Sequence, residues 1–146
     1  MPRRCRFVSC LWFVCLSAGC GGGETSAEPD ETEKRLRSIR LAYGMAMNEL
    51  RRPPKDAKEI RAQLVKMEIP NPDDELTSAR DNQPFVIVGG VFPKDMPESA
   101  KEARFIAYER VGSGGRKLGI DLRGLYFRVT DAELAGLKFP PGHLIP

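Results

Sequence analysis

The chain has 146 residues, of which 41% are hydrophobic and 29% are charged. This composition is typical of a globular domain with one core and excludes a disordered or fibrous protein. The formal net charge of +3 comes from 23 basic and 20 acidic residues. Because Arg3, Arg4 and Arg6 account for the whole surplus, the remainder of the chain is neutral and gives no reason to expect a nucleic-acid partner.

The first nineteen residues have the layout of a secretory signal peptide. A basic segment at residues 2–6 precedes an apolar segment at residues 7–18, which ends in small residues,. An apolar run of about twelve residues is shorter than the roughly twenty that a membrane-spanning helix needs. We therefore expect residues 1–19 to be removed. Cys5, Cys10 and Cys15 leave with them, so only Cys20 remains and no internal disulfide can form,.

Cys20 follows the residues LSAG, and this segment resembles the lipobox of bacterial lipoproteins, in which small residues precede a cysteine. Leu16 stands four positions before the cysteine, and Ser17 occupies the position where that class favours leucine. The resemblance implies that Cys20 receives a diacylglyceryl group and becomes the acylated first residue of the mature chain. The alternative is a secreted protein in which Cys20 is a free thiol. A metal site is disfavoured because one cysteine and one histidine cannot complete a ligand set,.

Residues 20–31 are rich in glycine, serine and acids and predict a flexible tether, with a reach of roughly 15–20 Å. Two or three acyl chains give a stable membrane anchor. The expected location is therefore the extracytoplasmic side of a membrane in the cell envelope, close to the lipid surface. Secretion remains the alternative.

Residues 32–146 form the predicted domain, and its first half is helical. Apolar residues recur every three or four positions on one face of a first helix, which Asp30 or Thr32 caps and which ends at Arg52 before two prolines,. That face comprises Leu36, Ile39, Tyr43, Ala46 or Met47, and Leu50. A second helix is expected over residues 56–67, followed by a loop over residues 70–84 with room for one helical turn.

The second half changes to strands. Apolar, β-branched or alternating runs occupy residues 84–92, 104–110, 117–122 and 125–129,. Hairpin loops are expected at residues 112–115 and at Arg123-Gly124, and a capping box at residues 130–133 opens a last short helix that reaches Leu137,. The predicted fold class is α+β: a long N-terminal helix packed on a three- to four-stranded antiparallel sheet, with short additional helices.

This order of elements resembles the periplasmic head of pilin-like and pseudopilin-like proteins. Residues 39–54, 105–110 and 119–134 are similar to segments of uncharacterised bacterial lipoproteins built on that head, although Arg123-Gly124 replaces the Asp-Gly turn frequent in such families. The chain has neither a prepilin cleavage site nor a twenty-residue apolar helix. The resemblance therefore implies a head domain for which lipid, in place of a membrane helix, is the anchor.

Few residues are candidates for chemistry. His143, the single histidine, lies among prolines and aliphatic residues and is expected to be an exposed tail residue. Residues 71–75 are acidic but lack the spacing of a calcium loop, so helix capping explains them. Gly89-Gly90 indicates a bulge or a close approach to the first helix. The basic residues Lys34, Arg35, Arg37 and Arg40 are either a solvated helix face or a patch that attracts anionic lipid.

No catalytic residue, cofactor-binding residue, metal ligand or cofactor is expected. The leading hypothesis is a lipid-anchored envelope protein with a non-catalytic binding or scaffolding domain and partners among other envelope proteins. The alternative is a small-ligand-binding or accessory subunit of an envelope or secretion complex, which an apolar pocket between helix and sheet would indicate. A third hypothesis, an enzyme, requires two or more titratable groups that converge in a cleft.

Overall fold

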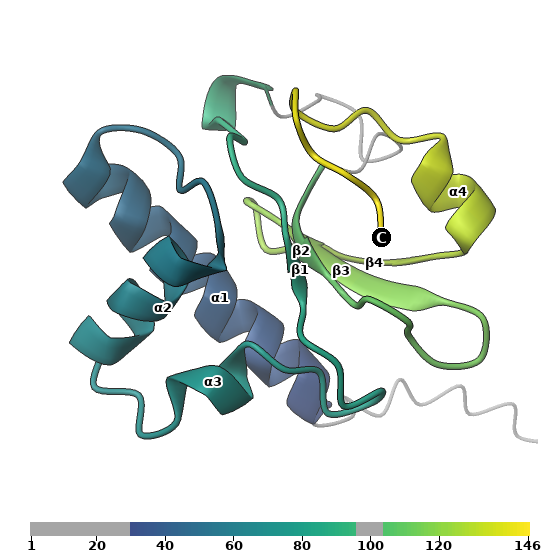
Figure 1. The fold of residues 1–146 in the computed structure, drawn as a ribbon, viewed down its shortest axis with the longest axis horizontal. Helices are drawn as coiled ribbons and strands as arrows, with labels where there is room; N and C mark the ends of the chain where they lie inside the picture. The colour runs from purple at the N-terminus through teal and green to yellow at the C-terminus, as the bar shows by residue number, and fades with distance from the viewer. Residues whose placement is uncertain (1–29, 96–103) are drawn as a thin grey trace, which may run out of the picture.

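The computed structural model describes residues 30–95 and 104–146 (Figure 1). The predicted signal peptide, Cys20 and all but the last two residues of the predicted tether lie outside the described residues. In the part that is described, no helix combines the length and apolarity that crossing a membrane requires.

Helix α1 spans Glu31–Leu50 and begins where an acidic side chain satisfies its first turn. The Asp30 carboxylate accepts a hydrogen bond from the Thr32 backbone N–H at 3.3 Å, so Asp30 is the cap,. The helix ends at Leu50 because Arg51 adopts a left-handed conformation with φ of 56°. The predicted apolar face is buried as far as Ala46, but Leu50 is exposed, so the expectation for that last position is wrong.

Two shorter helices follow, of which α2 packs beside the second half of α1 and α3 lies near the first half. Helix α2 spans Ala57–Lys66, and the Asp56 carboxylate caps it by accepting from the N–H of Lys58 at 2.9 Å. Its buried residues Ile60 and Leu64 belong to the main core. Helix α3, at Pro72–Glu75, is the single turn for which the sequence left room.

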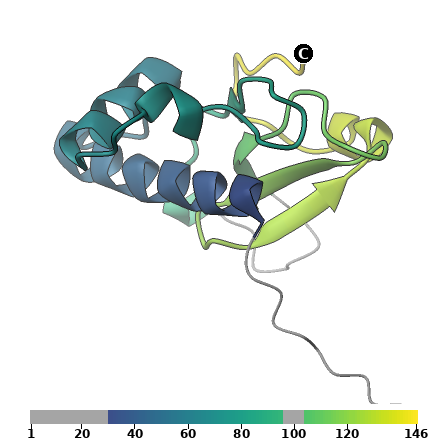
Figure 2. The same ribbon diagram turned by 90° about the horizontal axis from the view of Figure 1, so that it is seen from below.

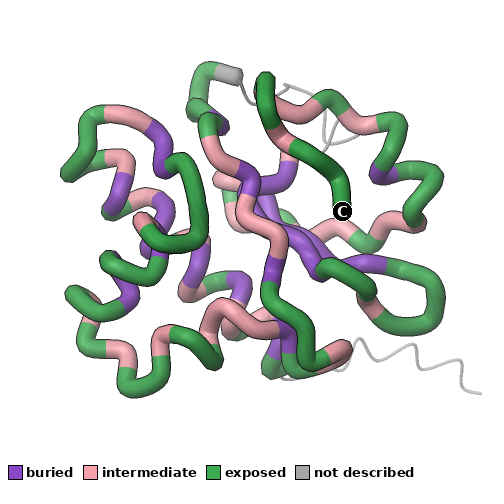
Figure 3. The backbone as a smooth tube through the Cα atoms, viewed as in Figure 1, coloured by how far each residue is buried: buried purple, intermediate pink, exposed green. Residues whose placement is uncertain are grey.

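Four antiparallel strands form a meander in the order β1-β2-β3-β4, with β1 at Val86–Ile87, β2 at Phe105–Tyr108, β3 at Lys117–Asp121 and β4 at Tyr126–Val129. Helix α1 lies against one face of this sheet (Figure 2), where the Tyr126 hydroxyl donates to the Glu33 carbonyl at 2.9 Å. Buried residues line the inner side of α1 and run along β2 and β3 (Figure 3). The predicted α+β class is confirmed.

Helix α4 spans Asp131–Ala135 and begins with the predicted capping box. The Thr130 hydroxyl accepts from the Glu133 N–H at 3.2 Å, and the Glu133 carboxylate accepts from the Thr130 N–H at 2.8 Å,. The helix ends two residues before the predicted Leu137. Residues 138–146, here called the C-terminal strap, then return across the molecule (Figure 1).

Strand β1 is much shorter than the predicted run of residues 84–92, because the chain turns toward the α1–α2 connection. A side chain at Gly89 would place its Cβ 2.3 Å from the Lys55 carbonyl oxygen. Gly90 has a φ of 78°, and its N–H donates to the Pro54 carbonyl at 3.1 Å. The two glycines thus permit a close approach to Pro54 and Lys55, and the expected approach to α1 itself is wrong.

Candidate functional site

The C-terminal strap covers the face of the sheet opposite α1. Successive side chains of a strand point to opposite faces, and Ile120 and Tyr126 face α1, so Gly119 and Phe127 face away from it. Tyr108, the partner of Gly119 in β2, contacts Phe139 and His143 of the strap.

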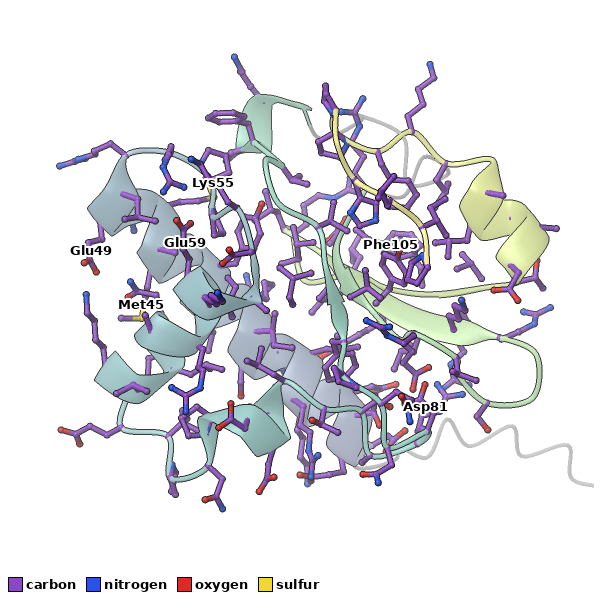
Figure 4. All side chains as sticks on the ribbon, viewed as in Figure 1. Met45, Glu49, Lys55, Glu59, Asp81 and Phe105 are labelled. Atoms are coloured by element: carbon purple, nitrogen blue, oxygen red, sulfur yellow. The ribbon has the colours of Figure 1, made fainter. Side chains whose placement is uncertain are left out.

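An aromatic cluster holds the strap in place. The Phe139 ring stacks on His143 with centroids 4.6 Å apart, and the Tyr108 ring lies 6.0 Å from each of them. Below the strap, Phe105 extends the cluster to Phe127 with ring centroids 5.8 Å apart, and Figure 4 shows Phe105 between the sheet and the strap. Such pairs add about 0.5–1.5 kcal/mol each beyond the area they bury.

His143 is half-buried in this cluster, so the expectation of an exposed tail residue is wrong. Its Nε2 lies 3.1 Å from the Tyr108 hydroxyl. With the imidazole proton on Nδ1, Nε2 accepts a hydrogen bond from the Tyr108 hydroxyl. Burial lowers the pKa of His143 and raises the pKa of Tyr108 to about 12, so both side chains are neutral near pH 7.

Two cavities lie on either side of Pro140-Pro141 in the strap. The first, here called the basic cavity, has a volume of about 450 Å³. Its lining comprises Gly90, Val91, Phe92, Lys94, Arg104, Phe105, Lys138, Phe139, Pro140 and Pro141. The second, here called the histidine cavity, measures about 520 Å³ and has Lys55, Ile87, His143 and Leu144 in its lining. Both are within the 300–1,000 Å³ range of small-molecule sites.

Three cations from separate parts of the chain surround the basic cavity. Lys94 lies in the 3₁₀ turn η1 at Pro93–Asp95, Arg104 directly precedes β2, and Lys138 opens the strap. None of the described lining residues is acidic, and none of these cations forms a hydrogen bond or ion pair with another described residue. The Lys94 ammonium lies 5.2 Å from the centre of the Phe92 ring. The cavity therefore combines aromatic walls with positive charge that no described carboxylate neutralises.

A buried polar cluster around Glu109 serves the fold. The Glu109 carboxylate accepts from the Ser78 hydroxyl at 2.8 Å and from the Leu118 N–H at 2.7 Å, and lies 3.2 Å from the Arg80 guanidinium. Ser78 and Glu109 are fully buried, so the hydroxyl has no route to a substrate. The cluster fastens residues 78–83 to the β2–β3 hairpin.

Asp81 completes this attachment from the same loop (Figure 4). Its carboxylate accepts from the N–H groups of Val111 at 3.1 Å and Gly112 at 2.7 Å. Burial raises the pKa of Asp81, but the backbone donors Gly112, Gln83 and Val111 together outweigh burial and leave the pKa lowered. The predicted hairpin loop at residues 112–115 is confirmed, since Ser113 and Arg116 pair across it.

The residues of the predicted basic cluster on α1 have different surroundings. Arg35 donates to the carbonyl oxygens of Asp74 and Thr77, both at 3.0 Å, and so joins α1 to the segment around α3. Arg37 is exposed, whereas Arg40 is half-buried and lies beside Gly124. The described arrangement is therefore no continuous four-residue basic patch.

The acidic residues 71–75 act differently from the prediction. Asn71 stands at the cap position of α3 but makes no capping bond through its side chain. Asp73 instead binds Arg61 of α2, with 2.7 Å between Oδ1 and Nε. The ion pair links α2 to α3, and the capping explanation is wrong for Asn71.

The interface between α1 and the sheet is filled by side chains. Leu36, Ile39 and Tyr43 have no exposed surface, and the Tyr43 hydroxyl donates to the Val88 carbonyl at 3.2 Å. The basic and histidine cavities lie instead beside the strap. The sequence did not single out Lys94, Arg104 or Lys138, because nothing local relates three cations that are separated by 10 and 34 positions.

Comparisons of the chain with known protein families, with curated proteins and with solved structures found no match.

Proposed function

We propose that this protein is a lipid-anchored cell-envelope protein whose α+β domain is a non-catalytic binding module. One observation carries the binding part of the proposal: the basic cavity places three cations without a described counter-ion beside aromatic walls. Charged side chains that lack partners within the fold are suited to a partner from outside it. The lipid anchor rests on the lipobox-like segment that ends at Cys20.

The arrangement of the elements gives this module a direction. The chain enters the domain at the N-terminal end of α1, and a helix of twenty residues is about 30 Å long,. Tyr43, in the second half of α1, accepts a hydrogen bond from the Val91 N–H at 3.0 Å, which fixes the segment leading to Lys94 at that half. In Figure 1 the turn at residues 93–95 lies at the end of the molecule away from the start of α1. An anchor at Cys20 would leave the cavities directed away from the membrane.

A small-ligand-binding role is the second candidate function. It is supported by the volumes of the two cavities, although they lie beside the strap and not between helix and sheet. A catalytic role has weaker support. Tyr108 and His143 form a hydrogen-bonded titratable pair beside the histidine cavity, yet Tyr108 is fully buried and its raised pKa makes it a poor acid near pH 7,.

The anchor is tested by growing cells with radiolabelled palmitate. The wild-type protein and the Cys15→Ser control are expected to carry the label, because Cys15 lies in the part of the chain that is removed. Cys20→Ser is expected to carry none. Absence of label from the wild-type protein, or label that persists after Cys20→Ser, would refute the anchor.

The binding module is tested by photo-crosslinking in cells. A photoreactive phenylalanine replaces Phe92, which lines the basic cavity, or Val111, an exposed residue of the β2–β3 hairpin that serves as the control. Mass spectrometry is expected to find a discrete adduct at position 92 and none at position 111. No adduct at position 92, or the same adducts at both positions, would contradict a binding role for this cavity.

A further inference from the structure

We propose that the basic cavity binds a small amphiphilic anion: one carboxylate or phosphate group held by Lys94, Arg104 and Lys138, joined to an aromatic or short aliphatic body. This inference rests on the proposed binding function and names the chemistry of its ligand. The charge and the walls of the cavity support it independently.

The charges favour an anion because all three cations line one cavity and none has a carboxylate partner among the described residues. A sphere of the cavity's volume is about 10 Å across, slightly more than the Debye length of roughly 8 Å at physiological salt, so screening weakens the repulsion among the three cations without abolishing it,. An anion among them relieves this repulsion and accepts charge-assisted hydrogen bonds, which are stronger than neutral ones. Of the three cations, the guanidinium of Arg104 can bind a carboxylate or phosphate through two parallel hydrogen bonds.

The walls favour an apolar body attached to the charge. Phe105 is 1% exposed, and its ring is fixed between Tyr108 at 5.9 Å and Phe127 at 5.8 Å. Phe139 is held by its stack on His143, and Pro140 and Pro141 have restricted backbones. Walls that are already ordered lose little conformational entropy when a ligand binds. A fully hydrated anion such as inorganic phosphate would leave these apolar walls unused.

A free acid and an anionic lipid headgroup share this chemistry, and the position of the cavity favours the free acid. The cavity is lined by residues 90–92 and Lys94 and by residues 138–141, and in Figure 1 these segments lie at the end of the molecule away from the start of α1. An anchored domain would therefore present it to the aqueous phase.

The test uses the mature, lipidated protein in phosphatidylcholine nanodiscs, with empty nanodiscs subtracted. Equilibrium dialysis measures the binding of 1-naphthoate, of the uncharged 1-naphthalenemethanol and of inorganic phosphate. Naphthoate is expected to bind at least about tenfold more tightly than either, because each of the others has only half of the required chemistry. Equal affinity for naphthoate and the alcohol would overturn the inference.

The variants use matched changes of charge. Lys94→Gln, Arg104→Gln and Lys138→Gln together are expected to weaken naphthoate binding at least about tenfold. The control combines Arg37→Gln, Lys58→Gln and Arg116→Gln, three exposed cations outside both cavities, and is expected to leave the affinity unchanged. Lys138→Glu, a single exposed change, repeats the test if the triple variant does not fold. Equal weakening by both sets would overturn the inference.

Two further outcomes distinguish a free acid from a lipid headgroup, and the proposed ligand from the proposed binding module. If phosphatidylglycerol nanodiscs abolish naphthoate binding, the cavity holds lipid headgroups, and the free-acid assignment is overturned. If position 92 crosslinks in cells but naphthoate does not bind, the amphiphilic anion is excluded while the binding module stands.

Discussion

Gly119 lies in β3 at a position where no side chain fits. A Cβ there would be 2.6 Å from two ring atoms of Phe105, a residue of the aromatic cluster beneath the strap. The strand has to lack a side chain at this point for the Phe105 ring to lie across it. At the scale of single residues, Gly119 therefore leaves the space in which Phe105 lines the basic cavity.

Gly119→Ala is expected to destabilise the domain by about 1–3 kcal/mol, because the ring must move within a packed cluster. Gly44→Ala makes the same chemical change on α1, where nothing lies within 4 Å of the new Cβ. It is expected to stabilise the domain by about 0.5–1 kcal/mol through improved helix propensity. Thermal unfolding followed by circular dichroism measures both, and a melting temperature that Gly119→Ala leaves unchanged would contradict the packing argument.

Glu109 is the residue on which the loop at 78–83 depends. Glu109→Gln removes the negative charge beside Arg80 and replaces an acceptor oxygen with a donor NH₂, although both oxygens accept hydrogen bonds in the fold. We expect a loss of about 1–3 kcal/mol in the free energy of unfolding. Urea denaturation measures it, with the exposed Glu68→Gln as the control. Equal midpoints for the two variants would show that the cluster contributes no stability.

At the scale of elements, the strap is fastened by a titratable ring. Burial lowers the pKa of His143 below its ordinary value of 6.5, so the unfolded chain binds the proton more tightly than the folded chain. The contribution of His143 to the free energy of unfolding is therefore fully present above pH 6.5,. It decreases as the pH falls from 6.5 to the lowered pKa of the folded state,. His143 is the single histidine, the side chain that ordinarily titrates between pH 5 and pH 8.

His143→Phe keeps a ring on Phe139 and removes the titration. When the pH is lowered from 7.5 to 5, the melting temperature of the wild-type protein is expected to fall further than that of this variant. The comparison cancels the contributions of carboxylates, whose shifts are common to both proteins. A difference that does not vary with pH would mean that the strap does not sense protonation of His143.

The elements that the sequence predicted well are those with local causes. Asp30, Asp56 and the pair Thr130 and Glu133 cap helices by bonding backbone groups two or three residues away, so short patterns locate these helix starts,. Strand β1 is different, because it stops where Gly89 meets Lys55, 34 positions earlier in the chain. No local pattern contains that contact, and the predicted strand was therefore too long.

At the scale of the whole molecule, the candidate site could not be predicted from the sequence for the same reason. The strap is apolar and proline-rich and has the composition of a tail, but Tyr108 and Phe139 turn it into the cover of a cavity. The balanced charge of the chain also conceals that Lys94, Arg104 and Lys138 gather at one cavity. These residues are far apart in the sequence and lie near one another only in the folded chain.

The position of the cavity relative to the start of α1 gives a prediction about orientation at a membrane. In a lipidated protein, Cys20 is blocked, so an introduced cysteine is the single free thiol. Arg37→Cys labels the N-terminal half of α1, and Lys94→Cys labels the cavity end; each removes one positive charge.

In vesicles whose headgroups carry a nitroxide quencher, fluorophores at position 37 are expected to be quenched more strongly than fluorophores at position 94. Because the predicted tether would let the domain turn, the difference is expected to be a time average that reflects the length of α1. Stronger quenching at position 94 would mean that the basic cavity faces the membrane, and the ligand would then have to be sought among its headgroups.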